Sequence, residues 1–444
     1  HNAKGIIKMS QDNTKRILFA DMEPEDRDGL DLVYLVNGST SGIEAAIMTA
    51  CKSGSSIIMN RGCHQSAYNA CILARVKPIF VKEDIDKENN ILMGASSQAY
   101  IEAIRTNPQA SAVFITRPSY YGMSQDIDEV VKLAHENKML VIVDEAHGAH
   151  FGLSHTLPKS AVYSGADLVI QSVHKTLPSL TQTSLMIYRR DRLDTARLSS
   201  VLSMVETSSP SYLMLMSIEI CYDIYEKSGL VLMQNLINNI YRFKRGLKDY
   251  KVFPTSDPSK IFVNTIEKGI NGYDFSKVLR HRYNIQVELA NYSGVLFLTT
   301  IANTKSDFDK TLFAMKDILE RKLFGALVDF SEDLNESRKE NRVGSIGSIY
   351  RSKPISLDLP VSIPIRGMDL DQAFDADKED VRIEDSLGRV GGEFVIPYPP
   401  GVAVLAPGEV IDQELIDFLV RAREMNIDIN GMESHALDKI KVIK

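Results

Sequence analysis

The chain has 444 residues, of which 44% are hydrophobic and 25% are charged. This length is too great for one compact core, so two or three domains are expected. The net charge of −7 argues against nucleic acid as a partner, and no apolar run approaches the ~18 residues of a membrane span. The four cysteines show neither metal-ligand spacing nor a disulfide framework, and no signal peptide is visible, so a cytoplasmic protein is expected.

The first recognisable unit follows a polar stretch, residues 1–31, which is expected to form an N-terminal arm, with DMEPEDRDGLD as a loop or arm. It consists of a strand (LVYLV), a Gly/Ser/Thr turn (NGSTSG) and a helix (IEAAIMTA). Backbone N–H groups at the helix start, with the hydroxyls of Ser39, Thr40 and Ser41, are suited to bind a phosphate. A simple Ser/Thr helix cap is the alternative, and the absence of a lysine after the turn disfavours an NTPase.

Strand and helix patterns then alternate as far as residue 143. Strands are expected at Ile57–Met59, 77–81 and 111–116, an acidic loop follows residue 81, and helices are expected at 98–107 and 126–138. Such alternation implies right-handed crossovers and a mainly parallel sheet.

Reactive residues follow two short apolar runs, Leu140–Val143 and Leu168–Ile170, which have the length and branching of buried parallel strands. The first run leads into DEAHGAH and the second into SVHKT. Ligands of open α/β sheets bind at the carboxyl ends of strands. Asp144 and Lys175, each just past a strand, match the needs of a Schiff-base cofactor. The lysine forms the imine, and the carboxylate keeps a pyridine nitrogen protonated.

Taken singly, each of these residues has a more ordinary explanation. Asp144 resembles a turn or helix cap, Lys175 a solvated surface residue, and His147 and His174 hydrogen-bonded structural residues. Packing alone does not explain why DEAHGAH and SVHKT occur together. Their conjunction therefore favours a functional site.

The second half of the chain predicts further domains. A TSSPSY break separates two helical runs, a long amphipathic helix spans 230–250, and short strands surround a helix in 251–325. Residues 326–350 are charged and rich in Gly and Ser, as in a linker, and a Pro-rich turn and a final helix follow. The expected division is an N-terminal arm (1–31), a large cofactor-binding domain (32–229), a small α+β domain (230–330), and a linker with a C-terminal domain (331–444).

Six motifs occur in the order NGSTSG, CHQS, DEAHGAHFG, QSVHKTLPSLTQTS, TSSPSYL and PYPPGVAVLAPGE. They resemble the bacterial ornithine/lysine/arginine decarboxylases, which are pyridoxal-phosphate enzymes of the aspartate-aminotransferase fold, and the resemblance covers roughly residues 32–444. It implies an α/β large domain with a mainly parallel sheet, a smaller α+β domain and a C-terminal domain. It also implies decarboxylation of lysine, ornithine or arginine to an amine or agmatine, as in polyamine biosynthesis.

The resemblance assigns roles around the cofactor ring. It implies that Lys175 carries pyridoxal 5'-phosphate, that Asp144 pairs with the pyridinium nitrogen and that His64 stacks on the ring. Ala146 would pack under the ring. His147 follows it, where some relatives place a Trp that reaches the phenolic oxygen.

The resemblance also assigns residues that would bind the phosphate, contact a neighbouring subunit and bind the substrate. Hydroxyl and imidazole groups would hold the phosphate: Ser39, Thr40, Ser41, Ser172 and His174. Thr207 and Ser208 match a segment that reaches the phosphate of a neighbouring subunit, which predicts a homodimer or higher homo-oligomer with a shared active site. Glu384 matches an acidic position at the active-site mouth and is the candidate contact for the basic amino acid, with a plain surface charge as the alternative.

The chain departs from this family in two places. The sequence is expected to represent a short form without the wing domain of the large relatives, and Leu30-Asp31 runs directly into the first strand where relatives insert a helical segment. Either residues are absent from the sequence, or part of a dimer-forming element is missing. Two other functions stay open. One is an aminotransferase or another lyase of this fold, for which Arg117 is a weak candidate to bind the α-carboxylate. The other is a non-catalytic homologue.

Overall fold

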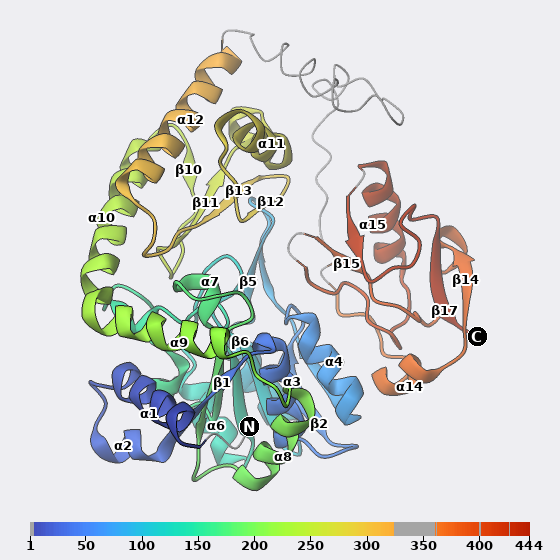
Figure 1. The fold of residues 1–444 in the computed structure, drawn as a ribbon. Helices are drawn as coiled ribbons and strands as arrows, with labels where there is room; N and C mark the ends of the chain where they lie inside the picture. Colours follow the sequence, from blue (N-terminus) through green and yellow to red (C-terminus); the bar gives the residue numbers. More distant parts are fainter. Residues whose placement is uncertain (1–3, 324–359, 361, 399–400, 426) are drawn as a thin grey trace.

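The computed structural model describes residues 4–323, 360, 362–398, 401–425 and 427–444, and Figure 1 shows how they are arranged. The first part of the chain is built on a seven-stranded sheet with the order β1-β9-β8-β7-β6-β2-β3. Only β9 (Ser184–Arg189) runs against its neighbours, so the prediction of a mainly parallel sheet is confirmed. The other strands are β1 (Leu30–Leu35), β2 (Ser56–Asn60), β3 (Lys77–Val81), β6 (Ala112–Thr116), β7 (Leu140–Asp144) and β8 (Leu168–Ser172).

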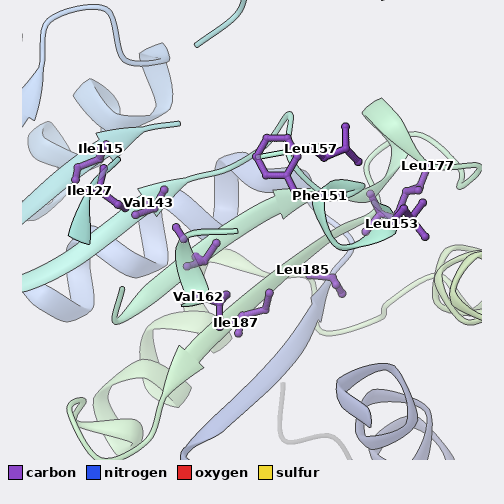
Figure 2. Packing of buried hydrophobic residues seen from close by; sticks show 14 of the residues in the cluster. Ile115, Ile127, Val143, Phe151, Leu153, Leu157, Val162, Leu177, Leu185 and Ile187 are labelled. Atoms are coloured by element: carbon purple, nitrogen blue, oxygen red, sulfur yellow. The ribbon is translucent and has the colours of Figure 1, made fainter. Parts of the chain in front are cut away.

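Both faces of this sheet are covered, which is why its strands are apolar throughout rather than alternating. In β7, Val141 and Val143 join one core cluster while Ile142 joins the other. Figure 2 shows part of the first cluster, where Val143 lies near Ile115 and Ile127. The covering helices are α3 (Gly38–Ala50), α4 (Gln65–Ala74), α5 (Ser97–Thr106), α6 (Asp128–Glu136), α8 (Thr195–Val205) and α9 (Tyr212–Ile224).

The N-terminal residues form two helices, α1 (Ile6–Leu18) and α2 (Pro24–Gly29). Helix α2 lies within DMEPEDRDGLD, which the sequence predicts as a loop or arm. The residues that α1 buries are mostly polar. Its Ser10 and Thr14 hydroxyls lie 3.0 and 2.7 Å from the hydroxyl of Tyr34 on β1, so hydrogen bonds hold this helix against the sheet.

A short hairpin, β4 (Asp84–Asp86) and β5 (Ile91–Gly94), replaces the acidic loop predicted after residue 81. Its turn is tied to the following domain through Asn89, whose side-chain oxygen accepts from Asn264 at 2.9 Å and whose carbonyl accepts from Asn291 at 3.0 Å. The hairpin therefore depends on contacts that are distant in sequence.

The next part of the chain holds a second, antiparallel sheet with the order β10-β11-β13-β12. Helix α9 passes through a π-helical turn (Tyr225–Gly229) into α10 (Leu230–Gly246), the predicted amphipathic helix. The remaining elements are β10 (Lys251–Val252), β11 (Lys260–Asn264), β12 (Leu289–Ala290), β13 (Gly294–Leu298), α11 (Gly272–Tyr283) and α12 (Lys305–Leu323). The predicted linker at 326–350 lies outside the described residues.

The C-terminal part packs beside α4, as Figure 1 shows in red. It has its own core, and a buried ion pair between Arg61 and Glu409 joins it to the large sheet domain. Its elements are α14 (Leu370–Asp375), β14 (Lys378–Arg382), β15 (Ile396–Pro397), α15 (Gln413–Glu424), β16 (Ile429–Asn430) and β17 (Lys439–Ile443). Helix α15 is the predicted final helix. The domain boundaries themselves stay a prediction. Within the described ranges, no helix is long and apolar enough to cross a membrane.

Candidate active site

The carboxyl ends of β7 and β8 bring the predicted aspartate and lysine together. Asp144 is the last residue of β7 and pairs in register with Ile170 of β8, while Lys175 lies in the short helix α7 (Val173–Thr176) that follows β8. Burial lowers the pKa of the Lys175 amine, although Asp144 and Glu288 attract its positive charge. The shift favours the neutral amine, which is the nucleophilic form.

Asp144 is buried, and a nearby backbone N–H group uses only part of the hydrogen-bond acceptor capacity of its carboxylate. The N–H of Ala146 donates to Oδ1 at 3.1 Å, and among the described residues no hydrogen-bond donor reaches Oδ2. Ala146 itself is buried beside it. A buried carboxylate oxygen with spare acceptor capacity fits a protonated ring nitrogen of a ligand.

His147 bridges the Lys175 amine and a second lysine. Its Nε2 lies 3.2 Å from Lys175 Nζ, and its Nδ1 lies 2.9 Å from Nζ of Lys260, the first residue of β11. The ring of Tyr120 lies edge-on, 5.1 Å away between centroids. Burial, reinforced by the positive charges of Lys260 and Lys175, lowers the pKa of His147 well below its ordinary value. The imidazole is therefore neutral at physiological pH.

Lys260 and its neighbours were not predicted from the sequence. The run KIFVNTI indicates a strand, and a lysine at the first position of a strand is normally taken to be solvent-exposed, yet every residue of β11 is buried. Tyr120 donates a hydrogen bond to Glu288 at 2.6 Å, and Glu288 attracts the charges of Lys175 and Lys260. The only sequence signal was a lysine in an otherwise apolar run. The role of this lysine becomes visible only when the second domain packs against the first and brings the Lys260 amine to His147.

His64 begins α4 and faces the same pair. Its Nδ1 accepts the backbone N–H of Ser66 at 3.2 Å, so the neutral ring carries its proton on Nε2. His64 is exposed as a residue, but neighbouring atoms displace enough water to lower its pKa, against the attraction of Asp144 and with the repulsion of Lys175. His64, Asp144 and Lys175 thus form one electrostatic unit.

A cluster of hydroxyls marks the candidate phosphate site. Ser39 Oγ lies 2.6 Å from Ser172 Oγ and 3.1 Å from Ser184 Oγ. The cap residue of α3, Asn37, makes no side-chain cap hydrogen bond, whereas Asp194 caps α8 through its side chain. The first N–H groups of α3 therefore lack the side-chain acceptor that such groups usually have, and an anion is suited to replace it.

Three of the other predicted phosphate ligands are placed differently. The hydroxyl of Ser41 is directed to the carboxylate of Glu206, which fixes the segment after α8 against the start of α3. Thr40 is exposed. His174 donates from Nδ1 to the carbonyl of Thr183 at 2.9 Å, which leaves Nε2 for a ligand. The structure thus favours Ser39, with Ser172 of the same cluster, over Ser41.

Two predicted residues are already engaged elsewhere. Glu384 is exposed on the C-terminal part and forms an ion pair with Arg423 at 2.9 Å. Arg117 is buried and donates to the carbonyls of Gln125 and Lys159, both at 2.7 Å, so its guanidinium is occupied and not available to bind an α-carboxylate. This arrangement disfavours the aminotransferase alternative.

Thr207 and Ser208 lie between α8 and α9, directly after Glu206. Ser208 is exposed, and the hydroxyl of Thr207 accepts the backbone N–H of Ser209 at 3.2 Å. Because Glu206 is held by α3, the two hydroxyls lie close in sequence to a group that contacts the phosphate loop of their own chain. Sequence alone did not indicate this proximity.

Comparisons with known proteins agree with the geometry. Residues 1–265 match the family described as Orn/Lys/Arg decarboxylase, major domain, and residues 369–436 match its C-terminal domain. The whole chain is similar to arginine decarboxylases of Bacillus subtilis (30% identical) and Bacillus anthracis (28%), and covers 86% of each. The lysine decarboxylase structure of Francisella novicida superposes with a TM-score of 0.81 at 18% identity, covering 99% of this chain and 72% of that one. The chain belongs to the Orn/Lys/Arg decarboxylase family and is an amino-acid decarboxylase, a carboxy-lyase.

Proposed function

We propose that the chain decarboxylates arginine to agmatine, with pyridoxal 5'-phosphate attached to Lys175. One observation carries the chemistry: the half-buried amine of Lys175, whose pKa is lowered, and the buried carboxylate of Asp144, which keeps spare acceptor capacity, lie at the ends of neighbouring strands. The two Bacillus relatives, both named arginine decarboxylase, favour arginine over other basic amino acids. Lysine is the alternative, because the superposed Francisella structure is a lysine decarboxylase.

The residues present fit this cofactor. Lys175 would be its covalent attachment, Oδ2 of Asp144 would receive the ring N–H, and the start of α3 with Ser39 and Ser172 would hold the phosphate. His64 is exposed and feels the charges of Asp144 and Lys175, and its imidazole would stack on the ring. When bound, the cofactor supplies an electron sink for the bond between Cα and the carboxylate.

The chain's own groups would then control charge and protons. Asp144 keeps a negative charge at the buried end of the site, where the low dielectric strengthens its pull on a nearby proton. His147, neutral and hydrogen-bonded to Lys175, orients the amine. A proton must return to Cα after CO2 leaves, and Lys175 and His64 are the proposed donors.

A substrate panel tests the proposal. The purified chain with pyridoxal 5'-phosphate is incubated with arginine, lysine or ornithine, and CO2 and the amine product are measured. Release of CO2 with agmatine from arginine supports the proposal, and a higher kcat/KM for lysine would transfer the assignment to lysine. Keto-acid formation without CO2 would contradict decarboxylation by this chain.

We also propose a homodimer with a shared active site in the cytoplasm. The exposed residues Leu213, Met216 and Ile220 recur along one side of α9, the helix that follows Thr207 and Ser208 in the chain. An apolar stripe of this kind is typical of an interaction surface. All four cysteines are buried and free, as suits a reducing compartment. Agmatine as the product would place the enzyme in polyamine biosynthesis.

Cofactor retention and assembly test the shared site together. Dilution through the dimer dissociation constant should release cofactor from the wild type, because a ligand that binds only the dimer stabilises it by mass action. Thr207→Ala with Ser208→Ala should weaken retention, while Met216→Glu should shift the sedimentation coefficient towards the monomer. A monomer that holds cofactor as tightly as the dimer would instead assign both hydroxyls to the phosphate loop of their own chain.

A further inference from the structure

Both ring nitrogens of His147 face a lysine amine: Nε2 faces Lys175 at 3.2 Å and Nδ1 faces Lys260 at 2.9 Å. A neutral imidazole donates from one nitrogen and accepts at the other. The two hydrogen bonds therefore require one amine that donates and one that accepts. With a neutral ring, both hydrogen bonds form only when the ring proton lies on the nitrogen that faces a neutral amine, while the other nitrogen accepts from the other lysine.

Lys260 differs from an ordinary buried cation. Its side chain is completely buried, and among the described residues its amine forms no ion pair with a carboxylate. The ring of Tyr120 lies 5.2 Å from the amine and supplies a weak cation–π attraction. A lysine that served only to hold two domains together would be expected to face an acid rather than an imidazole.

The surrounding charges set where this amine titrates. Burial lowers the pKa of Lys260 to about 8, against the attraction of Asp257 and Glu288 and with the repulsion of Lys175. Other titratable groups that act on Lys260, His147 or Lys175 are Asp144, His150 and His174. Lys260 is therefore able to gain and lose a proton near neutral pH, where most lysines stay charged.

We propose that Lys260 is a positioning residue that accepts a proton from Lys175 through His147 and later returns it. In the forward direction, the Lys175 ammonium gives a proton to Nε2 while the N–H at Nδ1 passes its proton to Lys260. On the ring, an N–H bond forms at Nε2 and the N–H bond at Nδ1 breaks, so the imidazole stays neutral and only its tautomer changes. The positive charge moves from Lys175 to Lys260, and no proton enters from water.

This inference rests on the proposed function, in which Lys175 must be a neutral nucleophile at one stage and a charged amine at another. The relay supplies both states inside a buried site. It also explains why a second lysine lies where its charge would otherwise be costly. The relay predicts that the tautomer of His147 depends on pH, which a purely structural lysine would not cause.

Nitrogen-15 NMR of the full-length chain with labelled histidine measures that tautomer directly, with His147→Asn used to assign the signals. In protein prepared without cofactor, the Nδ1–H form should increase as pH rises through about 8, because Lys260 then becomes the acceptor. An unchanged His147 tautomer over this pH range would overturn the relay. The pH titration itself is recorded on the wild type, and His147→Asn serves only to assign the signals.

Substitutions of Lys260 separate charge from proton transfer. Lys260→Arg keeps a cation that does not titrate, so His147 should stay in the Nε2–H form at every pH. Lys260→Met removes both charge and acceptor, and acylation of the Lys175 amine at pH 8 should slow by roughly tenfold because the neutral amine becomes rarer. Lys244→Met, at a half-buried lysine that also feels Asp257, is the matched control and should leave both readouts unchanged. If the tautomer of His147 changed with pH in Lys260→Arg as it does in the wild type, the proposal would be contradicted.

The proposed function is tested separately by reducing the cofactor-loaded chain with borohydride. Label on Lys175 with a pH-invariant His147 would refute the relay alone. Label on another lysine would refute the role of Lys175, whatever the tautomer of His147 does.

Discussion

Arg61 and Lys260 are buried cations in two separate polar clusters, and their pKa values are shifted in opposite directions. Arg61 donates to both carboxylate oxygens of Glu409, at 2.5 and 2.8 Å, and joins the large sheet domain to the C-terminal part. Burial would lower the pKa of Arg61, but Tyr68 and Glu409 outweigh it and the pKa rises. In the second cluster, burial wins and the pKa of Lys175 and of Lys260 falls.

The pKa shifts differ because the cations have different hydrogen-bond partners, not because they are buried to different depths. A bidentate carboxylate satisfies a guanidinium in geometry and in charge, and the pair acts as a fixed joint. The amines of Lys175 and Lys260 are hydrogen-bonded to one neutral imidazole. The imidazole supplies hydrogen-bond partners for both amines but no negative charge to balance them. Amines of this kind exchange protons readily, and perturbed groups of this kind are typical of reactive sites. Four substitutions test the contrast, in order of expected effect.

Lys175→Ala should abolish turnover, with a rate loss of roughly 10⁴-fold or more, because no amine remains to attach the cofactor or displace the product. The free energy of unfolding should change little, since the side chain is only half-buried. CO2 release and a urea titration measure the two effects. Substantial residual turnover would place the reactive amine elsewhere, with Lys260 as the first candidate.

Arg61→Met should act in the opposite way and destabilise the chain by about 3–5 kcal/mol, because Glu409 would stay buried without its partner. The double variant Arg61→Met with Glu409→Leu should recover most of that loss. Lys77→Met breaks the exposed ion pair with Asp369 and serves as the control, with a cost of about 0–1 kcal/mol. Urea titrations of all variants decide. A negligible loss in Arg61→Met would show that the joint is not structural.

Asp144→Asn should retain the cofactor but lose about 10²–10³-fold in rate, or roughly 3–4 kcal/mol of transition-state stabilisation. Asparagine still accepts the N–H of Ala146, so the strand end keeps its geometry while the charge disappears. Cofactor absorbance and single-turnover decarboxylation separate the two effects. Near-normal turnover would reduce Asp144 to a strand-end cap.

Glu384→Gln should change kcat/KM for arginine by no more than about twofold, because the exposed carboxylate is paired with Arg423 and solvent screens it. Arg423→Gln is the matched variant and should behave alike. Steady-state kinetics with arginine measure both. A large rise in KM for Glu384→Gln alone would restore the substrate role that the family resemblance assigns to this residue.

The physics of the sequence explains which parts of the fold were predictable. β7 and β8 are short, branched and apolar, so both strands are confirmed, although they end at Asp144 and Ser172, one and two residues beyond the predicted runs. The segment DMEPEDRDGLD, predicted as a loop or arm, contains the short helix α2, and the helix before it, α1, packs through the hydroxyls of Ser10 and Thr14, a contact that the sequence does not predict. Ser41 has the residue type of a phosphate ligand, but its direction is set by Glu206, far away in the chain.

The sequence by itself determined the parallel sheet, the family and the positions of Asp144 and Lys175, because local periodicity and motif order carry that information. The tertiary structure decided the rest of the site. Lys260 lies at the start of a strand in a different sheet, and only the packing of the two sheets brings its amine to His147. Burial and electrostatic interaction depend on distance in space, so the chemistry of that lysine exists only in the folded chain.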